Sequence, residues 1–445
     1  MTSMAASFRE HRTLLLICGL AAVIRLTTAI PLHQATFTSD EKEYLLLATR
    51  MIDDHMFLDS NNEWSVKPPG FPALLAGMFE IFGRSLIPLL LLNAILGALA
   101  APLGYFVVRD LSGAPIAPFL SAAILALHPS LVIYGAVLQS EVLYIDVLLL
   151  VILLSLRVMC KPTLSLAIGL GLLLAALILI RAIGLAVAAA LFVTLIFVID
   201  APLQKRFKTI AASVLALVIG LTPWTLRNYS IHHAFVPVST FSGTSLLIGN
   251  NPYSNGTTAL PPQYFAWVDS EATLRGLPDP AAMTEVGREH FHRDVALSWI
   301  ADHPAEWSRL LLKKLEVLWI YPVTTTAENH KVQAVAMAAD ALLWLGALAG
   351  ILVLWKERRI FLLFSTVIIC VTFAHVIMHT EARYRLPLIA VLGIFFGPGS
   401  MLILQHPWES LRNSSRGALA SAGVVALLLI IGYLAAGVMF FHGEV

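Results

Sequence analysis

The sequence predicts an all-α protein that crosses a membrane about eleven times. Two observations lead to this fold class. Hydrophobic residues make up 58% of the 445 residues and charged residues only 13%, whereas a soluble globular domain carries about 25% charged residues. The hydrophobic residues also gather in about eleven runs, each close to the roughly 20 residues that a helix needs to cross a bilayer. A soluble globular protein is therefore excluded.

The apolar runs cover most of the chain outside two polar stretches. Their approximate bounds are residues 13–30, 86–108, 115–134, 142–159, 164–180, 183–199, 208–224, 336–355, 360–378, 385–404 and 418–441. A shorter apolar stretch at 72–83 predicts a partial or interfacial helix, so the number of spans is open by one or two. The first run follows Arg9, His11 and Arg12 without a small-residue cleavage site, and we expect an uncleaved first span.

Basic residues in the short connections predict the orientation of the spans, because Lys and Arg accumulate on the cytoplasmic side. With the N-terminus inside, every cytoplasmic connection is basic. These connections hold Arg109, Arg157, Lys161, Lys205, Arg206, Lys208, Lys356, Arg358, Arg359, Arg412 and Arg416. The opposite side then receives the loops 31–85 and 225–335, the links around Glu141 and Arg181, and the turn 380–385.

Two long polar stretches divide the chain into three parts. Residues 1–224 form a predicted N-terminal transmembrane module, whose first outer loop, 31–85, is the candidate catalytic loop. Residues 225–335 are too many for a plain connection and include an amphipathic stretch at 283–315, which predicts a small periplasmic loop subdomain. Residues 336–445 form the predicted C-terminal transmembrane helices.

Charge and cysteine usage exclude further classes. The net charge is +1 and basic residues form no dense run, so nucleic acid is not an expected partner. Cys18, Cys160 and Cys370 all lie inside apolar runs, which predicts small buried residues rather than disulfides or metal ligands. The histidines show no metal-binding spacing either. The residues alone therefore predict no metal site.

The first outer loop contains two adjacent carboxylates, Asp40 and Glu41. Thr38 and Glu41 fit a capping box, in which both side chains satisfy backbone N–H groups at a helix start. An apolar face follows at helical spacing from Tyr44 to Ile52, as in a helix that lies at the membrane surface. The two acids can therefore both act only to stabilise the helix N-terminus, or one of them can act as a catalytic base.

Lys67 and Glu141 are two further outer residues with both a structural and a functional interpretation. Lys67 precedes Pro68-Pro69-Gly70, a stiff turn that either only starts the next helix or also holds the ammonium beside a lipid phosphate. Glu141 lies between long apolar runs. An ionisable group at such a depth is costly unless it faces a partner or a cavity, which favours a functional role over helix capping.

Arginines near the outer ends of the spans are candidate ligands for an anion. Arg227 ends one span, and Arg383 and Arg385 occupy the turn before another. Each can anchor a helix at the lipid headgroups or grip a phosphate with paired donors. We interpret Arg25 and Arg181 as snorkelling or structural residues.

These motifs occur in an order that resembles a known family. In chain order they are Asp40-Glu41 with Tyr44 and Ala48, Pro68-Pro69-Gly70-Phe71-Pro72, Ser140-Glu141, Pro223-Trp224 with Arg227-Asn228, and Glu381-x-Arg383-Tyr384-Arg385-x-Pro387. This order resembles the polytopic GT-C glycosyltransferases of the protein-mannosyltransferase and aminoarabinose-transferase type, in particular the bacterial branch of lipopolysaccharide-core sugar transferases. The resemblance extends over most of the chain.

The resemblance implies an inverting transfer of one sugar from a polyprenyl-phosphate donor to an envelope acceptor, on the periplasmic face of the bacterial inner membrane. It implies Asp40 as the general base with Glu41 beside it, and Glu141 as a second acid that orients hydroxyl groups. It also implies two pockets. The donor-phosphate pocket would contain Lys67, Arg227, Arg383 and Arg385, and the substrate pocket Tyr44, Tyr384 and Asn250.

Two departures from the family pattern leave points open. The aminoarabinose branch has a metal-holding acid before the lysine, whereas this chain has Val66, so no cofactor is certain and a divalent metal stays open. The soluble domains of the eukaryotic protein mannosyltransferases have no counterpart here, which weakens the expectation of a protein acceptor. Lipid A, lipopolysaccharide core, cell-wall glycan and protein all remain as acceptors.

A polytopic transporter or lipid-linked sugar flippase is the alternative function. Such a protein needs polar groups near the middle of the membrane and access from both sides. The spans are almost uncharged in their interiors, and the ionisable groups gather on one side of the membrane. This distribution favours the enzyme.

Overall fold

The computed structural model describes residues 2–34, 38–321, 323 and 330–405, and all regular structure in these residues is helical. The first half contains α1 (Thr2–Gln34), α2 (Ser39–Asp53), α3 (Gly70–Phe82), α4 (Leu86–Leu111), α5 (Ala117–Leu127), α6 (Pro129–Gly135), α7 (Ser140–Cys160), α8 (Leu164–Ile180), α9 (Gly184–Val198) and α10 (Leu203–His232). The second half contains α11 (Ser242–Gly249), α12 (Pro262–Leu274), η1 (Pro280–Ala282), α13 (Glu285–Asp302), α14 (Pro304–Trp319), α15 (His330–Leu354), α16 (Arg358–Ile377), η2 (Ala382–Arg385) and α17 (Leu386–Gln405). The predicted all-α fold class is confirmed.

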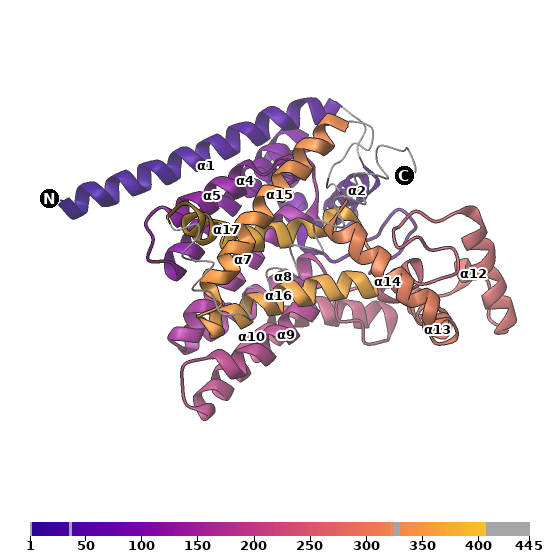
Figure 1. Ribbon diagram of the computed structural model, residues 1–445. Helices are drawn as coiled ribbons and strands as arrows, with labels where there is room; N and C mark the ends of the chain where they lie inside the picture. The colour runs from indigo at the N-terminus through magenta and orange to yellow at the C-terminus, as the bar shows by residue number, and fades with distance from the viewer. Residues whose placement is uncertain (1, 35–37, 322, 324–329, 406–445) are drawn as a thin grey trace.

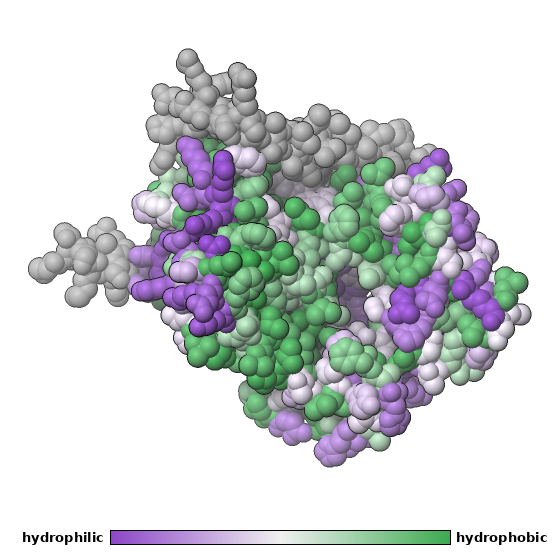
Figure 2. Space-filling model, turned by 90° about the horizontal axis from the view of Figure 1, so that it is seen from below, coloured by the Kyte–Doolittle hydropathy of each residue, from purple (hydrophilic) through white to green (hydrophobic). Residues whose placement is uncertain are grey.

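The long apolar helices identify a multi-pass membrane protein. Within the described residues, seven helices are long and apolar enough to cross a bilayer, or up to eight if the bent pair α5 and α6 is one span. Helices α8 and α9 match predicted runs but have only 17 and 15 residues. The expected count of eleven spans is not reached in this part of the chain, and the run 418–441 lies outside it. Figure 2 shows hydrophobic side chains gathered between two hydrophilic ends.

Helices α7 and α17 form the centre of the bundle. The most apolar part of α7 is 72% buried and that of α17 is 78% buried, whereas that of α1 is only 17% buried. Helix α15 packs closely along α17, because glycines let the two backbones approach. A Cβ atom on Gly399 would lie 1.9 Å from the carbonyl oxygen of Gly346. Figure 1 shows α1 along one edge of the bundle.

The interior of the bundle contains charged groups, which corrects the expectation that the spans are almost uncharged inside. Asp340 on α15 lies 2.6 Å from Nη2 of Arg385 and 3.3 Å from Nε2 of His128, and all three side chains are fully buried. Arg25 on α1 is also fully buried and donates to the carbonyl oxygens of Leu125 and Ala126. These groups join helices that are distant in sequence.

The first outer loop folds back onto the bundle through α2 and α3. Thr38 and Glu41 form the capping box that the sequence predicted at the start of α2. The apolar face of α2 is buried at Tyr44, Leu47 and Ala48, and α2 packs against α3. The start of α2 is therefore fixed by its cap, and its orientation by its apolar face.

Helices α11 to α14 gather at one end of the bundle, opposite the N-terminus (Figure 1). This end is the outer side in the predicted orientation. The segment has a small apolar core of its own, which includes Leu247, Val268, Phe291 and Val295. The carboxylate of Glu285 on α13 accepts hydrogen bonds from the backbone N–H groups of Trp64 and Ser65 and from the Thr240 hydroxyl. The large loop is thereby joined to the first outer loop.

The buried ion pair of Asp340 predicts a large loss of stability on removal of one charge. The variant Asp340→Asn leaves the Arg385 guanidinium buried without a charged partner. Breaking a buried pair in this way costs about 3–5 kcal/mol. We expect a marked fall in the melting temperature of the purified protein in detergent, measured by differential scanning fluorimetry.

The matched control is Asp53→Asn, which makes the same chemical change in the exposed ion pair of Asp53 with Arg84. Exposed ion pairs contribute little to stability because water and salt screen them. The control is expected to melt close to the wild-type protein. Equal melting temperatures for the two variants would contradict the structural role of Asp340.

Candidate active site

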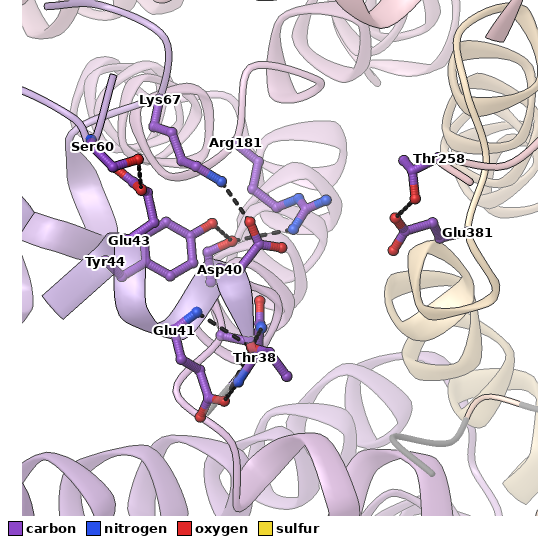
Figure 3. A network of polar contacts seen from close by, with 12 residues as sticks. Thr38, Asp40, Glu41, Glu43, Tyr44, Ser60, Lys67, Arg181, Thr258 and Glu381 are labelled. Carbon is purple, nitrogen blue, oxygen red and sulfur yellow. Dashed lines mark hydrogen bonds and ion pairs between the residues drawn. The ribbon is translucent and has the colours of Figure 1, made fainter. Parts of the chain in front are cut away.

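A cluster of charged side chains lies where the first outer loop meets the outer ends of α7, α8 and α16. The name "charged cluster" denotes six side chains: Asp40, Lys67, Glu141, Arg181, Glu381 and Arg383. They come from separate elements, since Asp40 begins α2, Glu141 lies in the first turn of α7 and Arg383 lies in η2. Figure 3 shows Asp40, Lys67 and Arg181 close together at this place.

Asp40 lies between two cations. Its Oδ1 atom is 2.6 Å from Nζ of Lys67, and its Oδ2 atom is 2.8 Å from Nη2 of Arg383. The Lys67 ammonium also lies 5.2 Å from the centre of the Tyr44 ring. Both carboxylate oxygens of Asp40 are therefore paired with positive charge.

The proline turn places Lys67. Pro68 and Pro69 lead into α3, and the backbone of Gly70 packs against the end of α8, where a Cβ atom would lie 2.8 Å from the Leu179 carbonyl oxygen. Only glycine permits this approach without displacing backbone atoms. The stiff turn thus fixes the ammonium beside the start of α2.

Glu141 is the buried acid of the charged cluster and is paired with Arg181. Its Oε1 atom is 2.7 Å from Nη1 of Arg181 and 3.9 Å from Nε of Arg383, and its side chain is only 1% exposed. The Ser140 hydroxyl accepts a hydrogen bond from Arg181 and lies 3.1 Å from the Tyr44 hydroxyl. The first turn of α7 therefore supplies a buried acid that is fixed by an arginine.

Tyr384 supports the two arginines of the charged cluster. The guanidinium carbons of Arg181 and Arg383 lie 5.2 and 5.6 Å from the centre of its ring. His375 stacks on the same ring at 4.6 Å, and Nε2 of His379 lies 2.9 Å from the Tyr384 hydroxyl. The ring is thereby held between two histidines and two cations.

Glu381 joins the charged cluster to the large outer loop. Its Oε2 atom is 2.5 Å from Nε of Arg383, and its Oε1 atom accepts a hydrogen bond of 2.6 Å from the Thr258 hydroxyl (Figure 3). The backbone N–H of Thr380 donates to the carbonyl oxygen of Gly256 at 3.0 Å. The position of Arg383 therefore depends on the loop that follows α11.

The ion pairs dominate the titration of Asp40 and Lys67. Burial alone would raise the pKa of Asp40, but the charges and hydrogen bonds of Lys67 and Arg383 hold this pKa well below its usual range. Burial alone would lower the pKa of Lys67, but Tyr44 and Asp40 raise it. Both groups are therefore charged at neutral pH, and Asp40 is a weak base in this state.

The charged cluster is electrically balanced, because it contains three carboxylates and three cationic side chains. The side chains of Asp40, Lys67 and Arg383 are 24%, 25% and 19% exposed, so a ligand can reach them, whereas the Glu141 side chain is buried. A base next to two accessible cations can bind an anion and accept a proton in the same place.

Two expected site residues lie near the cluster but are engaged elsewhere. The Glu41 carboxylate accepts hydrogen bonds from Thr38 and from the backbone N–H of Leu138, so it caps α2 and fixes the link before α7. Arg227 donates to the carbonyl oxygens of Phe57 and Trp64 and thus supports the loop that leads to Lys67. The structure gives neither side chain a contact with Asp40.

Two further expected residues lie apart from the cluster. Arg385 is adjacent to Arg383 in sequence, but its side chain is fully buried against Asp340. Asn250 is fully buried in the outer subdomain, where its Oδ1 atom accepts a hydrogen bond of 2.9 Å from Nζ of Lys314. The expected residues that do meet are Asp40, Lys67, Glu141 and Arg383, with Tyr44 and Tyr384 beside them.

Several members of the site were missed in the sequence. Arg181 was interpreted as snorkelling or structural, although it pairs with Glu141. Glu381, Gln139, His375 and His379 were not among the expected site residues, although Gln139 accepts a hydrogen bond from Arg383 at 3.3 Å. A signal for Arg181 existed, because an arginine in the short outer link between two apolar runs faces the same side as Glu141.

The site does not suit a divalent metal. No group of three His, Cys, Asp or Glu side chains in the part of the chain that the structure describes is arranged to hold one. The three carboxylates of the charged cluster are already neutralised by three cations, and Val66 stands where the resemblance would place a metal-holding acid. A metal would have to displace these ion pairs, so we derive no step through one.

Part of the chain matches a known family. Residues 66–225 match the family described as dolichyl-phosphate-mannose-protein mannosyltransferase. The matched segment includes Lys67, Glu141 and Arg181 of the charged cluster and covers a little over a third of the chain. No curated protein matches the chain by sequence.

The fold is similar to that of solved membrane transferases. The oligosaccharyltransferase of Archaeoglobus fulgidus in its apo form superposes with a TM-score of 0.54 at 15% identity, over 95% of this chain. The same enzyme tethered to an acceptor peptide superposes equally well, at 14% identity. The chain spans about half the length of this protein, 55% in the apo form. ArnT from Cupriavidus metallidurans bound to undecaprenyl phosphate gives a TM-score of 0.43 at 16% identity, over 88% of this chain and 79% of ArnT. The similarity to the oligosaccharyltransferase shows that the chain has the GT-C fold.

The environment of Lys314 predicts a pH dependence of stability. Burial lowers the pKa of Lys314 to about 7. Below pH 7 the side chain is protonated in the folded and the unfolded protein, and its burial is a cost. Between pH 7 and its ordinary pKa near 10.5, only the unfolded chain binds this proton, so stability rises with pH.

We expect Lys314→Met to flatten this rise, because methionine has no proton to release. The measurement is the melting temperature of wild type and variant from pH 6 to pH 9. The control Lys313→Met changes an adjacent, partly exposed lysine whose partners are Glu316 and Tyr321. A Lys314→Met variant whose melting temperature follows pH as steeply as the wild type would contradict the assignment.

Proposed function

We propose that this protein is a membrane glycosyltransferase that transfers a sugar from a polyprenyl-phosphate donor to an envelope acceptor on the periplasmic face. The observation that carries the proposal is the pairing of the accessible Asp40 carboxylate with Lys67 and Arg383, at 2.6 and 2.8 Å. A proton acceptor and a phosphate site thereby coincide. The GT-C fold and the family match to residues 66–225 support this reaction class.

The proposed reaction needs one carboxylate. An acceptor hydroxyl attacks the anomeric carbon from the side opposite the phosphate, the bond from that carbon to the phosphate oxygen breaks, and a glycosidic bond forms with inversion. The polyprenyl phosphate leaves with the bonding electrons, and Asp40 takes the proton of the hydroxyl. The phosphate is a competent leaving group without protonation, unlike the leaving group in glycoside hydrolysis, which requires a second carboxyl group.

Binding of the donor would change the state of Asp40. The phosphate oxygens need the same two cations that hold Asp40 in the ligand-free protein. When Lys67 and Arg383 turn to the phosphate, Asp40 loses its partners and gains a neighbouring negative charge, and both changes raise its pKa. The donor thus converts a weak base into a stronger one, which predicts that the donor binds before the acceptor reacts.

The remaining site residues position these groups. Glu141, held by Arg181, is placed to orient a sugar hydroxyl, and Tyr384 fixes the two arginines. Residues 1–224 would supply the base and Lys67, residues 225–335 the outer wall, and residues 336–445 Arg383. The polyprenyl chain would lie along the apolar flanks of the helices, since the ion pairs lie at the outer ends of the spans.

The transporter alternative has less support. Among the buried charges inside the bundle, Asp340 is paired with Arg385 and Arg25 is hydrogen-bonded to carbonyl oxygens, whereas the Asp146 carboxylate on α7 has no hydrogen bond within the described residues. Such closed contacts suit helix packing better than a transport path. The accessible ionisable groups of the charged cluster lie at one end of the spans, as an enzyme with access from one side requires.

The role of Asp40 predicts a loss of turnover without a loss of folding. Asp40→Asn keeps the size of the side chain but cannot accept the proton. Transfer is expected to fall by about 10²- to 10⁴-fold, the usual contribution of a general base. The measurement is transfer from polyprenyl-phosphate sugars to envelope acceptors, followed by mass spectrometry. Asp54→Asn, at the exposed far end of α2, is the control. Normal turnover in Asp40→Asn would refute the assignment.

The role of Lys67 predicts two effects. Lys67→Met removes one charge-assisted bond to the phosphate, so affinity for undecaprenyl phosphate should fall by about 10- to 100-fold. It also raises the pKa of Asp40 in the free enzyme. Because activity requires ionised Asp40 and is lost as pH falls through this pKa, the acidic limb of kcat/KM should move to higher pH. Binding of undecaprenyl phosphate is measured by calorimetry in detergent. An unchanged affinity together with an unchanged pH profile of kcat/KM would exclude this role.

A further inference from the structure

A second pocket lies in the outer subdomain, away from the charged cluster. It has a volume of about 520 Å³ and opens between the loop after α11 and the helices α13 and α14. The lining residues are Asn251, Pro252, Ser254, Asn255, Trp299, His303, Glu306, Arg309, Leu310 and Lys313. The volume lies within the range of small-molecule sites, roughly 300–1,000 Å³.

One wall of the pocket is rigid. The buried side chain of Asn251 donates to the carbonyl oxygens of Leu247 and Ile248 and accepts from the backbone N–H of Tyr253. Gly256 adopts a φ of +92°, where a side chain would be strained and would press on Lys314. The loop 250–256 is therefore held in one shape before any ligand arrives, which lowers the entropic cost of binding.

The opposite wall is one face of α14. Arg309 and Leu310 each lie three or four residues from both Glu306 and Lys313, so the four side chains share one face of the helix. Glu306 and Arg309 are exposed, and within the described residues neither carries a hydrogen bond or ion pair. A carboxylate and a guanidinium thus face the pocket with their hydrogen-bonding capacity unused.

The floor adds an aromatic pair and a free nitrogen. The rings of Trp299 and His303 stack at 5.5 Å. Nδ1 of His303 lies 3.1 Å from the Trp299 carbonyl oxygen, which leaves its Nε2 atom for a ligand. Donors, acceptors and apolar surface are therefore mixed around the whole pocket.

The loop that forms the rigid wall also contacts the charged cluster. Four residues of this loop line the pocket, and the next ones hold Thr380 through Gly256 and Glu381 through Thr258. Glu381 in turn pairs with Arg383. The pocket and the proposed transfer site are thus two sides of one short loop.

We propose that this pocket binds a saccharide, namely a sugar unit of the acceptor glycan next to the one that receives the transferred sugar. A sugar presents many hydroxyl groups that both donate and accept, together with apolar C–H faces. Glu306, Arg309, Asn255 and His303 match the hydroxyl groups, and Trp299, Leu310 and Pro252 match the C–H faces. The acceptor role rests on the proposed function, whereas saccharide binding does not.

The lining disfavours the other candidate ligands. A polyprenyl chain would have to desolvate Glu306 and Arg309 without giving them partners, which is costly. An acceptor peptide would be expected to use apolar side-chain pockets or a free strand edge, and the described residues contain no strand. A lone phosphate could use Arg309 but would leave the neighbouring Glu306 carboxylate without a donor, and Lys313 is already paired with Glu316.

The experiment uses the full-length protein, immobilised in detergent, and needs no turnover. Oligosaccharides released by mild acid from the envelope of the source cells are passed over it, and retained sugars are identified by mass spectrometry. Two binding variants are compared with the wild type, Arg309→Gln and Glu306→Gln. The control Arg293→Gln removes an exposed arginine on α13 that, among the residues described, pairs with the adjacent Asp294 alone and does not line the pocket.

We expect wild type and Arg293→Gln to retain the same saccharide, and Arg309→Gln and Glu306→Gln to bind it at least 10-fold more weakly. All four proteins should bind undecaprenyl phosphate equally. In transfer assays the two binding variants should raise KM for the acceptor and leave kcat unchanged.

Equal retention by all four proteins would overturn the proposal, as would retention of peptides from a tryptic envelope digest in place of sugars. Failure of the proposed function has a different signature. In that case undecaprenyl phosphate would not bind the wild type, whatever the variants in the pocket do.

Discussion

The pairing of Asp40 with Lys67 and Arg383 is the constraint on which the outer half of the structure depends. It joins the start of α2, the proline turn before α3 and the turn before α17, which lie far apart in the sequence. Each partner is fixed in turn, Asp40 by the helix cap, Lys67 by the close approach of Gly70 to α8, and Arg383 by Glu381 and Tyr384. A displacement of any one of these elements would therefore move the site.

The apolar surroundings of Glu141 explain why it is paired with an arginine. Glu141 is 1% exposed at the start of a helix whose other residues are almost all apolar, and such a charge needs a close partner. Arg181 supplies it at 2.7 Å from the link between α8 and α9. The same demand explains the pairing of Asp340 with Arg385 deeper in the bundle. Paired charges thus fix the orientation of helices that apolar contacts alone would leave free to slide.

Sequence patterns predicted the helices better than the contacts between side chains of different helices. Run length and composition predicted ten apolar runs that correspond to α1, α4 to α10 and α15 to α17, with α5 and α6 together in one run. Thr38 and Glu41 predicted the start of α2. These signals are local. Arg383 and Arg385 are two residues apart in one turn, and only the packing of α15 decides that Arg385 turns inward to Asp340 while Arg383 reaches Asp40. Arg181 was missed for the same reason, since its role depends on α7 lying beside it.

The neutrality of the charged cluster gives the proposed chemistry its direction. Before the donor binds, the charges of three carboxylates and three cationic side chains cancel. A phosphodiester then adds one negative charge to a partly buried site. Asp40 has just lost its partners, so its negative charge becomes costly and its affinity for a proton rises. A proton taken from the acceptor hydroxyl neutralises Asp40 as the glycosidic bond forms, and the negative charge passes to the leaving phosphate, beside Lys67 and Arg383. Binding of the donor and activation of the acceptor would then be two parts of one electrostatic change, and no further acid or metal is required to couple them.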